Sequence, residues 1–300
     1  MMKRVGKETL YFAIGRDNAP VLTVDPGEEF EIETQMNRGP WIDTHPDREI
    51  IEAKLTGPNP SSGCVFVNGA ACGQMLSVSI GRIDLGPVGY TRFSGSTGAM
   101  PGRLGSSAIG YQAKIVQIDN GMIRWSDTLS IPVRPMIGFV GVAPEKERHH
   151  HGWAGYWGGN FDIQEVTTGA TVHLPVYVPG ALLHIGDMHA IQGDGEICGA
   201  GGIETEGFVR VKCTLHDKPQ SMSYPRIEND THIIAVGVDK PAEDAFRIAL
   251  ENLILWMEES YSFSRGEAYM LLAQVMEARC TQFVNPSYTY VAKINKKYLV

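Results

Sequence analysis

The side chains best suited to catalysis or metal binding in this sequence are concentrated between residues 158 and 206. Two short motifs stand out, GGNFD at 158–162 and GDMHAIQGDGE at 186–196. In both, glycines allow the backbone to turn sharply beside carboxylates, amides and an imidazole. Side chains alternate along an extended strand, so we expect Asp187 and His189 on one face and His184 on the other.

A carboxylate and an imidazole on one face are two suitable ligands for Zn²⁺ or a similar ion. Asp162 or Glu196, each on a different turn, is the predicted third ligand. A metal-bound water is a strong nucleophile at neutral pH, which suits hydrolysis. The spacing also allows a plain structural hydrogen bond between Asp187 and His189 at a strand end, because it is not an established metal signature.

Two other groups of residues have ligand character. Asp43 and His45 repeat the two-residue spacing of an acid and a histidine, and they form the second candidate metal pair. The run His149–His150–His151 is compatible with a metal site, but an internal histidine run is more typical of a solvated loop. Nearby aromatic side chains, Trp157 among them, would either close over the site or pack beneath this loop.

The elements that must position these residues are mainly strands. From residue 20 to about 240, apolar and polar residues alternate with a period of two, for example Phe30 and Ile32 against the glutamates between them. The segment 119–121, DNG, lies between two apolar runs and is a strong hairpin signal. Glycines and prolines spread along the chain suit many short strands joined by tight turns.

After residue 239 the period becomes helical. Pro241 suits the first turn of a helix, and SRGE at 264–267 has the form of a capping box that begins a second helix. We predict a single domain over residues 1–300, β-rich at 1–239, with a helical hairpin at 240–284 and a closing strand within 285–300. The predicted fold class is mainly β, sandwich-like or barrel-like and α+β overall.

Composition limits the possible partners. The 300 residues carry 26 basic and 34 acidic side chains, a net charge of −8, which disfavours binding to nucleic acid or to an anionic membrane surface. The sequence shows no membrane-spanning apolar run and no signal peptide, and the odd number of scattered cysteines disfavours a disulfide framework. We therefore expect a soluble cytoplasmic protein.

The central motifs also carry a resemblance to a known family. GGNFD at 158–162, LPVYVPGAL at 174–182 and GDMHAIQGDGE at 186–196 resemble the acetamidase/formamidase family in order and spacing. The segments 63–70, 138–144 and 264–269 resemble the family as well, so the resemblance covers most of the chain. Departures occur at Met188 and Ile191, where the family usually has small residues, and at 41–46, WIDTHP, in place of a Gly-rich segment.

The resemblance implies hydrolysis of a short aliphatic amide to a carboxylate and ammonia by a homodimer or a larger homo-oligomer. In this interpretation Asp162, Asp187 and His189 hold a divalent metal, Zn²⁺ or Ca²⁺, or orient the water. Glu196 acts as general base and then as general acid. Asn160 and Gln192 orient the amide substrate.

Two alternatives remain open at the level of sequence. One keeps the fold but changes the substrate to another linear C–N bond, of the urea or carbamoyl type. The other is a non-catalytic β-sandwich binding module in which the Gly-Asp turns hold a structural ion. Convergence of Asp162, Asp187, His189 and Glu196 on one place favours an enzyme, whereas their dispersal over separate turns favours the module.

Overall fold

The computed structural model describes residues 2–37, 53, 55–94, 98–103 and 111–300. Asp43, His45 and the rest of the segment 41–46 lie outside the described residues, so the second candidate metal pair stays a prediction.

The main regular structure of the described chain is β-strand. The strands are β1 (Lys3–Val5), β2 (Leu10–Tyr11), β3 (Ala13–Ile14), β4 (Leu22–Val24), β5 (Glu29–Thr34), β6 (Ser61–Ser62), β7 (Val65–Val67), β8 (Gln74–Ser94), β9 (Tyr111–Asp119), β10 (Met122–Arg124), β11 (Ser130–Pro132), β12 (Met136–Gly141), β13 (His149–His150), β14 (Ala154–Gly155), β15 (Gly158–Asn160), β16 (Thr171–Pro175), β17 (His184–His189), β18 (Ala200–Asp217), β19 (Arg226–Glu228), β20 (His232–Asp239), β21 (Glu277–Gln282) and β22 (Tyr288–Asn295). The helices are α3 (Ala242–Tyr261), α4 (Arg265–Val275) and the short 3₁₀ helix η2 (Lys296–Tyr298).

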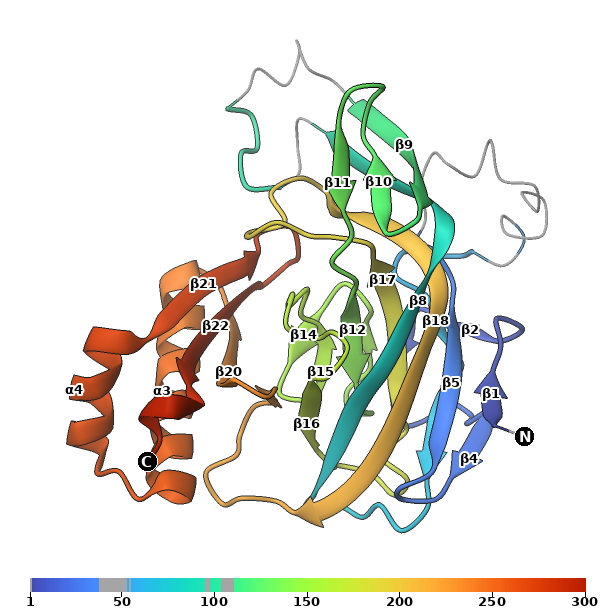
Figure 1. The fold of residues 1–300 in the computed structure, drawn as a ribbon. Helices are drawn as coiled ribbons and strands as arrows, with labels where there is room; N and C mark the ends of the chain where they lie inside the picture. The colour runs from blue at the N-terminus through green and yellow to red at the C-terminus, as the bar shows by residue number, and fades with distance from the viewer. Residues whose placement is uncertain (1, 38–52, 54, 95–97, 104–110) are drawn as a thin grey trace.

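Two long antiparallel strands, β8 and β18, form the backbone of one large curled sheet and run side by side along the molecule (Figure 1). Shifts in their register bend the pair, because an extra residue on one strand increases the local twist. On its other edge, the middle of β18 pairs with β5. The start of β18 pairs with the end of β17. The predicted mainly β fold is confirmed.

The local patterns explain these strands. In β5 the apolar residues are buried and the glutamates face outward or are half-buried, as the alternation predicts. The hairpin of β9 and β10 turns at Asn120 and Gly121, whose φ angles are 49° and 75°. Both angles lie in the left-handed region that a tight two-residue hairpin requires. We call the extension formed by β9, β10 and β11, at the top of Figure 1, the β9–β11 arm.

The C-terminal part forms a second layer in which α3 packs on β20 and β22 (Figure 1). The helix α4 begins at the predicted capping box, where Ser264 accepts from the Glu267 amide. The prediction that this helical region continues to residue 284 is wrong, because α4 ends at Val275 and β21 follows. The closing strand is confirmed as β22.

At the centre of the sheet, β12 and β17 are buried along their whole length. They pair with each other in antiparallel register, and β15 lies on the other edge of β12. Side chains on these strands are therefore shielded from water and fixed by packing on several sides. None of the helices in the described ranges is both long enough and apolar enough to cross a membrane.

Candidate active site

Four carboxylates and one imidazole lie together in the interior of the protein. Asp162 follows β15, Asp187 and His189 belong to β17, Glu196 lies between β17 and β18, and Glu204 is on β18. Each of the five is at most 5% exposed. We call these residues the acid cluster. The four residues predicted from the sequence therefore converge, and Glu204 joins them.

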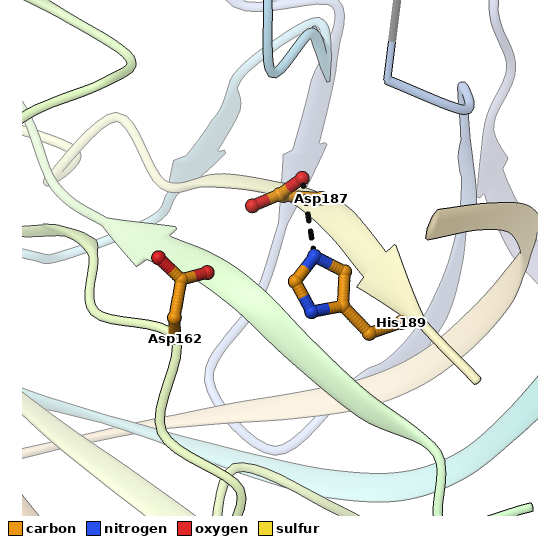
Figure 2. Close-up of side chains that lie close together, drawn as sticks. All are labelled: Asp162, Asp187 and His189. Atoms are coloured by element: carbon orange, nitrogen blue, oxygen red, sulfur yellow. Dashed lines mark ion pairs between the residues drawn. The ribbon is translucent and has the colours of Figure 1, made fainter. Parts of the chain in front are cut away.

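The backbone at three of these acids is unusual. The φ angles of Asp162, Asp187 and Glu196 are 51°, 56° and 40°, in the left-handed region that few non-glycine residues adopt, with Asn and Asp enriched among those that do. Conformations of this kind persist only where the surrounding structure fixes them, and they are enriched at functional sites. At Asp187 this turn aims the carboxylate toward Asp162 and His189 (Figure 2).

Gly138 on β12 provides the space for two of the carboxylates. A Cβ atom at this position would lie 2.5 Å from Asp162 Oδ1 and 2.7 Å from Asp187 Oδ2. Both distances are far below van der Waals contact, so only glycine fits here without moving the acids.

Asp162 is held from one side only. Its Oδ2 accepts hydrogen bonds from the side-chain amides of Asn160 at 3.0 Å and Asn285 at 2.9 Å. Its Oδ1 has no hydrogen-bond partner among the described residues and faces the other acids. Burial, followed by repulsion from the Asp187 carboxylate, raises the pKa of Asp162 to about 8.

His189 is oriented by Gln192. The Gln192 side-chain amide donates to the main-chain oxygens of Asp162 at 2.8 Å and Thr281 at 3.1 Å, so its Oε1 is left to accept from His189 Nδ1–H at 2.9 Å. In the neutral form of this tautomer, the Nε2 lone pair faces the centre of the cluster. There Nε2 lies 3.6 Å from Asp187 Oδ1 and 3.4 Å from Glu204 Oε2.

Charge in the cluster favours a cation at its centre. Burial opposes the charged imidazole, yet the Glu204 and Asp187 carboxylates hold the pKa of His189 well above its usual value. Burial and the Asp162 carboxylate raise the pKa of Glu196 well above its usual value, and burial with Asp187 raises that of Glu204. Four buried carboxyl groups repel one another when ionised, so they require protons or a cation between them.

Atoms without partners indicate where a metal ion fits. Among the described residues, Asp162 Oδ1, Asp187 Oδ1, His189 Nε2, Glu196 Oε2 and Glu204 Oε2 are buried and make no hydrogen bond. Asp162, Asp187 and His189 offer ligand atoms within 4.8 Å of one another, and so do His189, Glu196 and Glu204. Both sets share His189. Carboxylate oxygens and an imidazole nitrogen are ligands that divalent ions such as Zn²⁺ accept.

The two predicted amide residues differ in what they contact. Asn160 Oδ1 is buried and has no hydrogen-bond partner among the described residues. Both donors of the Gln192 amide are occupied by main-chain oxygens, and its oxygen accepts from His189. Asn160 therefore retains an acceptor for a ligand, whereas Gln192 is committed to the protein.

The histidine run has a different environment from the predicted solvated loop. His150 is exposed, but His151 is fully buried and His149 stacks on Trp157 at 3.7 Å between ring centroids. His151 Nδ1 donates to the main-chain oxygen of Asn59 at 2.7 Å. The solvated-loop prediction is therefore wrong for two of the three histidines, and of the two roles for Trp157 the packing role is the one observed.

Glu204 is the acid that sequence reasoning missed. Glu204 and Glu206 are two residues apart in β18, so the alternating pattern of the sequence gives both acids the same position. Only the pairing of β18 with β17, which sets Glu204 opposite His189, separates them. Asn59 was missed too, although its amide donates to Asp187 Oδ2 at 3.4 Å.

Two cavities lie next to the acid cluster. One of about 660 Å³ is polar and includes Glu165 and Arg279 in its wall. The other, of about 470 Å³, lies against the β9–β11 arm and includes Trp125 and Ile203. Both reach Gln192, the residue that orients His189.

Comparison with known proteins gives an independent result. The model of the acetamidase/formamidase family matches residues 155–294. A solved acetamidase from Yersinia enterocolitica is 32% identical with a TM-score of 0.88, covering 100% of this chain and 93% of the other. A solved acetamidase from Bacillus halodurans is 30% identical with a TM-score of 0.88, covering 98% of both chains.

A curated formamidase from Methylophilus methylotrophus is 48% identical over 58 residues. That match spans 19% of this chain and only 14% of the formamidase. The two solved structures, in contrast, are similar along their whole length. Because the identity, the coverage and the fold agree over the entire chain, this protein belongs to the acetamidase/formamidase family.

Proposed function

We propose that the protein hydrolyses a short aliphatic primary amide to a carboxylate and ammonia. The observation that carries this proposal is the acid cluster, in which four acids and an imidazole from β17, β18 and two connecting segments point unpartnered atoms at one another in a buried place. Such an arrangement is costly to fold, because buried charges and unsatisfied polar atoms destabilise the native state. A binding module with separate Gly-Asp turns would not require it.

Asp162, Asp187 and His189 would hold a divalent cation, with Glu204 as a further ligand or as a carboxylate that fixes His189. The imidazole favours Zn²⁺ over Ca²⁺, because Ca²⁺ prefers an all-oxygen set. A bound cation would supply positive charge that activates water and offsets negative charge on the amide oxygen.

Glu196 moves the proton in this proposal. Its Oε1 accepts from the Gly201 amide at 3.3 Å, whereas Oε2 has no partner. Oε2 takes the proton from the attacking water and then gives it to the nitrogen of the departing ammonia. A carboxyl group whose pKa is raised by burial suits both tasks near neutral pH.

Two amide side chains complete the arrangement. Asn160 Oδ1 accepts a hydrogen bond from the NH₂ group of the substrate and so orients the amide. Gln192 acts on His189 instead of on the substrate, because its hydrogen bonds hold the imidazole in the Nδ1–H tautomer. This assignment departs from the expectation that Gln192 orients the amide.

Ammonia release from formamide, acetamide and propionamide tests the proposal, measured before and after chelation and with Zn²⁺ or Ca²⁺ added back. We expect activity to disappear with the chelator and to return with Zn²⁺. Activity that ignores chelation would overturn the cation and leave the chemistry to Glu196 and its neighbours. No ammonia from any of these amides would overturn the proposed activity.

Substitution of the base gives the second test. Glu196→Gln removes the proton acceptor, and we expect kcat to fall by about 10²–10⁴-fold. The matched control is Asp194→Asn, an exposed acid in the same loop that pairs with Arg279 on the surface. An equal loss in both variants would show that the loop as a whole matters and would exclude a specific role for Glu196.

We also propose that the chain assembles as a homodimer or a larger homo-oligomer. The β9–β11 arm supports this, because Tyr111, Ile115 and Leu129 are 55%, 38% and 48% exposed there. Large apolar side chains gathered on a projecting element are typical of protein interfaces. Light scattering of the wild type and of a Tyr111→Ser, Leu129→Ser variant tests it, and a monomeric wild type would exclude it.

A further inference from the structure

The cavity of about 470 Å³ lies between the β9–β11 arm and the residues that connect β17 to β18. Its outer wall includes Lys114 on β9 and Trp125 after β10, and its inner wall includes Ile191, Gly193 and Ile203. We call it the arm cavity.

The arm cavity lies beside residues that hydrogen-bond to the acid cluster. Gln192 and Gly201 both line it. Gln192 Oε1 binds His189, and the Gly201 amide binds Glu196 Oε1. One residue therefore separates the cavity from the imidazole, and one separates it from the proposed base.

The walls of the arm cavity suit an apolar group about the size of a six-membered ring. Ile131, Ile191 and Ile203 pack around Trp125 as part of one apolar cluster. Cavities of about 300–1,000 Å³ hold ligands the size of a drug molecule. The methyl group of acetamide occupies a small part of such a space, so the volume remains unexplained by the smallest amides.

The charges around the arm cavity have one sign. Its lining includes Arg92, Lys114 and Arg134, and no Asp or Glu is among the described residues that line it. This is unusual for a chain with a net charge of −8. The Lys114 ammonium lies 5.1 Å from the centre of the Trp125 ring, and within the described ranges neither Lys114 nor Arg134 pairs with a carboxylate. The basic groups are therefore available to an anion.

We propose that the amide hydrolysed by this protein carries an acyl group with an apolar, ring-sized body and a carboxylate at its far end. The apolar body occupies the arm cavity, and Lys114 and Arg134 bind the carboxylate. The amide end reaches the acid cluster past Gln192. This inference rests on the proposed amide hydrolysis, keeps its chemistry and extends the substrate from short aliphatic amides to amides with a larger acyl group.

The first experiment compares three amides with the wild-type protein. The amides are acetamide, para-methylphenylacetamide and para-carboxyphenylacetamide, and the last two differ mainly in the terminal charge. We expect kcat/KM for the carboxylate to exceed that for the methyl compound at least ten-fold. We also expect both aryl amides to exceed acetamide, because the ring is removed from water.

Two variants test whether the basic residues of the arm cavity cause the preference for the carboxylate. In a Lys114→Met, Arg134→Met protein we expect the ratio of the two aryl amides to fall to about one. The matched control is Lys212→Met, which removes an exposed lysine of β18 outside the cavity and keeps the ratio of the wild type.

A third variant fills the arm cavity. Gly193 lies at its inner wall, and a Cβ atom there would meet nothing within 4 Å. Gly193→Leu therefore adds a side chain whose Cβ atom has room, and we expect kcat/KM for the aryl amides to fall at least ten-fold more than for acetamide.

The outcomes separate this inference from the proposed function. Acetamide hydrolysis with equal kcat/KM for the two aryl amides would overturn the substrate class and leave the amidase proposal standing. A charge preference that survives loss of both basic groups would also overturn it. No ammonia from any of the three amides would overturn the amidase proposal itself. The wild-type comparison decides even where a variant fails to fold.

Discussion

At the scale of single residues, the acid cluster has a backbone conformation and a burial of charged groups that are both unfavourable for its residues. A left-handed backbone costs an ordinary residue such as Glu196 roughly 1–2 kcal/mol, whereas Asp162 and Asp187 are of a type that adopts it more readily. The same residues also bury carboxyl groups, which further opposes folding. The surrounding strands therefore offset both costs, and the site depends on their packing.

Glu204 is the first residue to test at this scale. Its Oε2 lies 3.4 Å from His189 Nε2, so Glu204→Gln removes a charge that either binds the cation or fixes its imidazole ligand. Loss of such a group costs about 10–100-fold in metal affinity. We expect Zn²⁺ affinity to fall by that factor, measured by competition with a coloured chelator.

Glu206→Gln is the control, because Glu206 is two residues further along the same strand and pairs with Lys7 instead. We expect its Zn²⁺ affinity to equal that of the wild type. Unchanged affinity in Glu204→Gln would exclude Glu204 from the cation site and leave Asp162, Asp187 and His189 as the proposed ligands.

Much of the cluster could be predicted from the sequence because its residues lie beside glycines in two short motifs. Asp187 and His189 are two positions apart in a strand, and they do lie together while His184 binds Ser61 elsewhere. Glu204 could not be predicted, because alternation cannot distinguish it from Glu206. The contact of Gln192 with His189 could not be predicted either, because only the folded chain brings the Thr281 main-chain oxygen to the Gln192 amide.

At the scale of elements, β12 contributes the empty space that the acids occupy. Gly138→Ala places a methyl group 2.5 Å from Asp162 Oδ1 and 2.7 Å from Asp187 Oδ2, so the carboxylates must move apart. Misplacement of catalytic groups by about 1 Å costs on the order of 10²-fold in rate. We expect amide hydrolysis to fall by at least that factor, measured as kcat/KM for acetamide.

Gly266→Ala is the matched control for that substitution. Gly266 lies in α4, and a Cβ atom there meets nothing within 4 Å. Alanine in a helix is favoured over glycine by up to about 1 kcal/mol, so this variant is expected to be at least as stable as the wild type. Full activity in Gly138→Ala would show that the carboxylates can move without loss.

The elements themselves could largely be predicted, except at one boundary. The alternation of apolar and polar residues predicted β5, and the DNG hairpin signal predicted the turn at Asn120. The capping box predicted the start of α4. The end of α4 could not be found, because no glycine or proline marks it near Val275. The following strand β21 is fixed by pairing with β22, a long-range contact that a local pattern does not contain.

At the scale of the whole molecule, buried histidines couple stability to pH. Burial lowers the pKa of His151 to about 4 and that of His184 well below its usual value. The unfolded chain binds protons at these sites below about pH 6.5, whereas the folded chain does not, so their contribution to stability is lost as pH falls from 6.5 toward 4. For His151 this loss is on the order of 3 kcal/mol.

Urea unfolding at pH 7 and pH 5 measures this loss, and His151→Gln isolates it. We expect the free energy of unfolding to fall less between these pH values in His151→Gln than in the wild type. The acid cluster contributes in the opposite direction, because its raised carboxyl pKa values favour proton uptake by the folded state. An identical change in both proteins would contradict the assignment to His151.

The pairing of β18 with β5 has a consequence for synthesis of the chain. Thr34 pairs with Gly207, and β8 pairs with β18 along most of its length, although β9 and β16 pair with parts of β8 earlier in the chain. A chain that leaves the ribosome from its N-terminus therefore carries unpaired strand edges until more than two thirds of it has been made. Such contacts between distant residues slow folding, and exposed edges recruit other chains. These edges are therefore the parts of a newly made chain most exposed to aggregation until β18 is made.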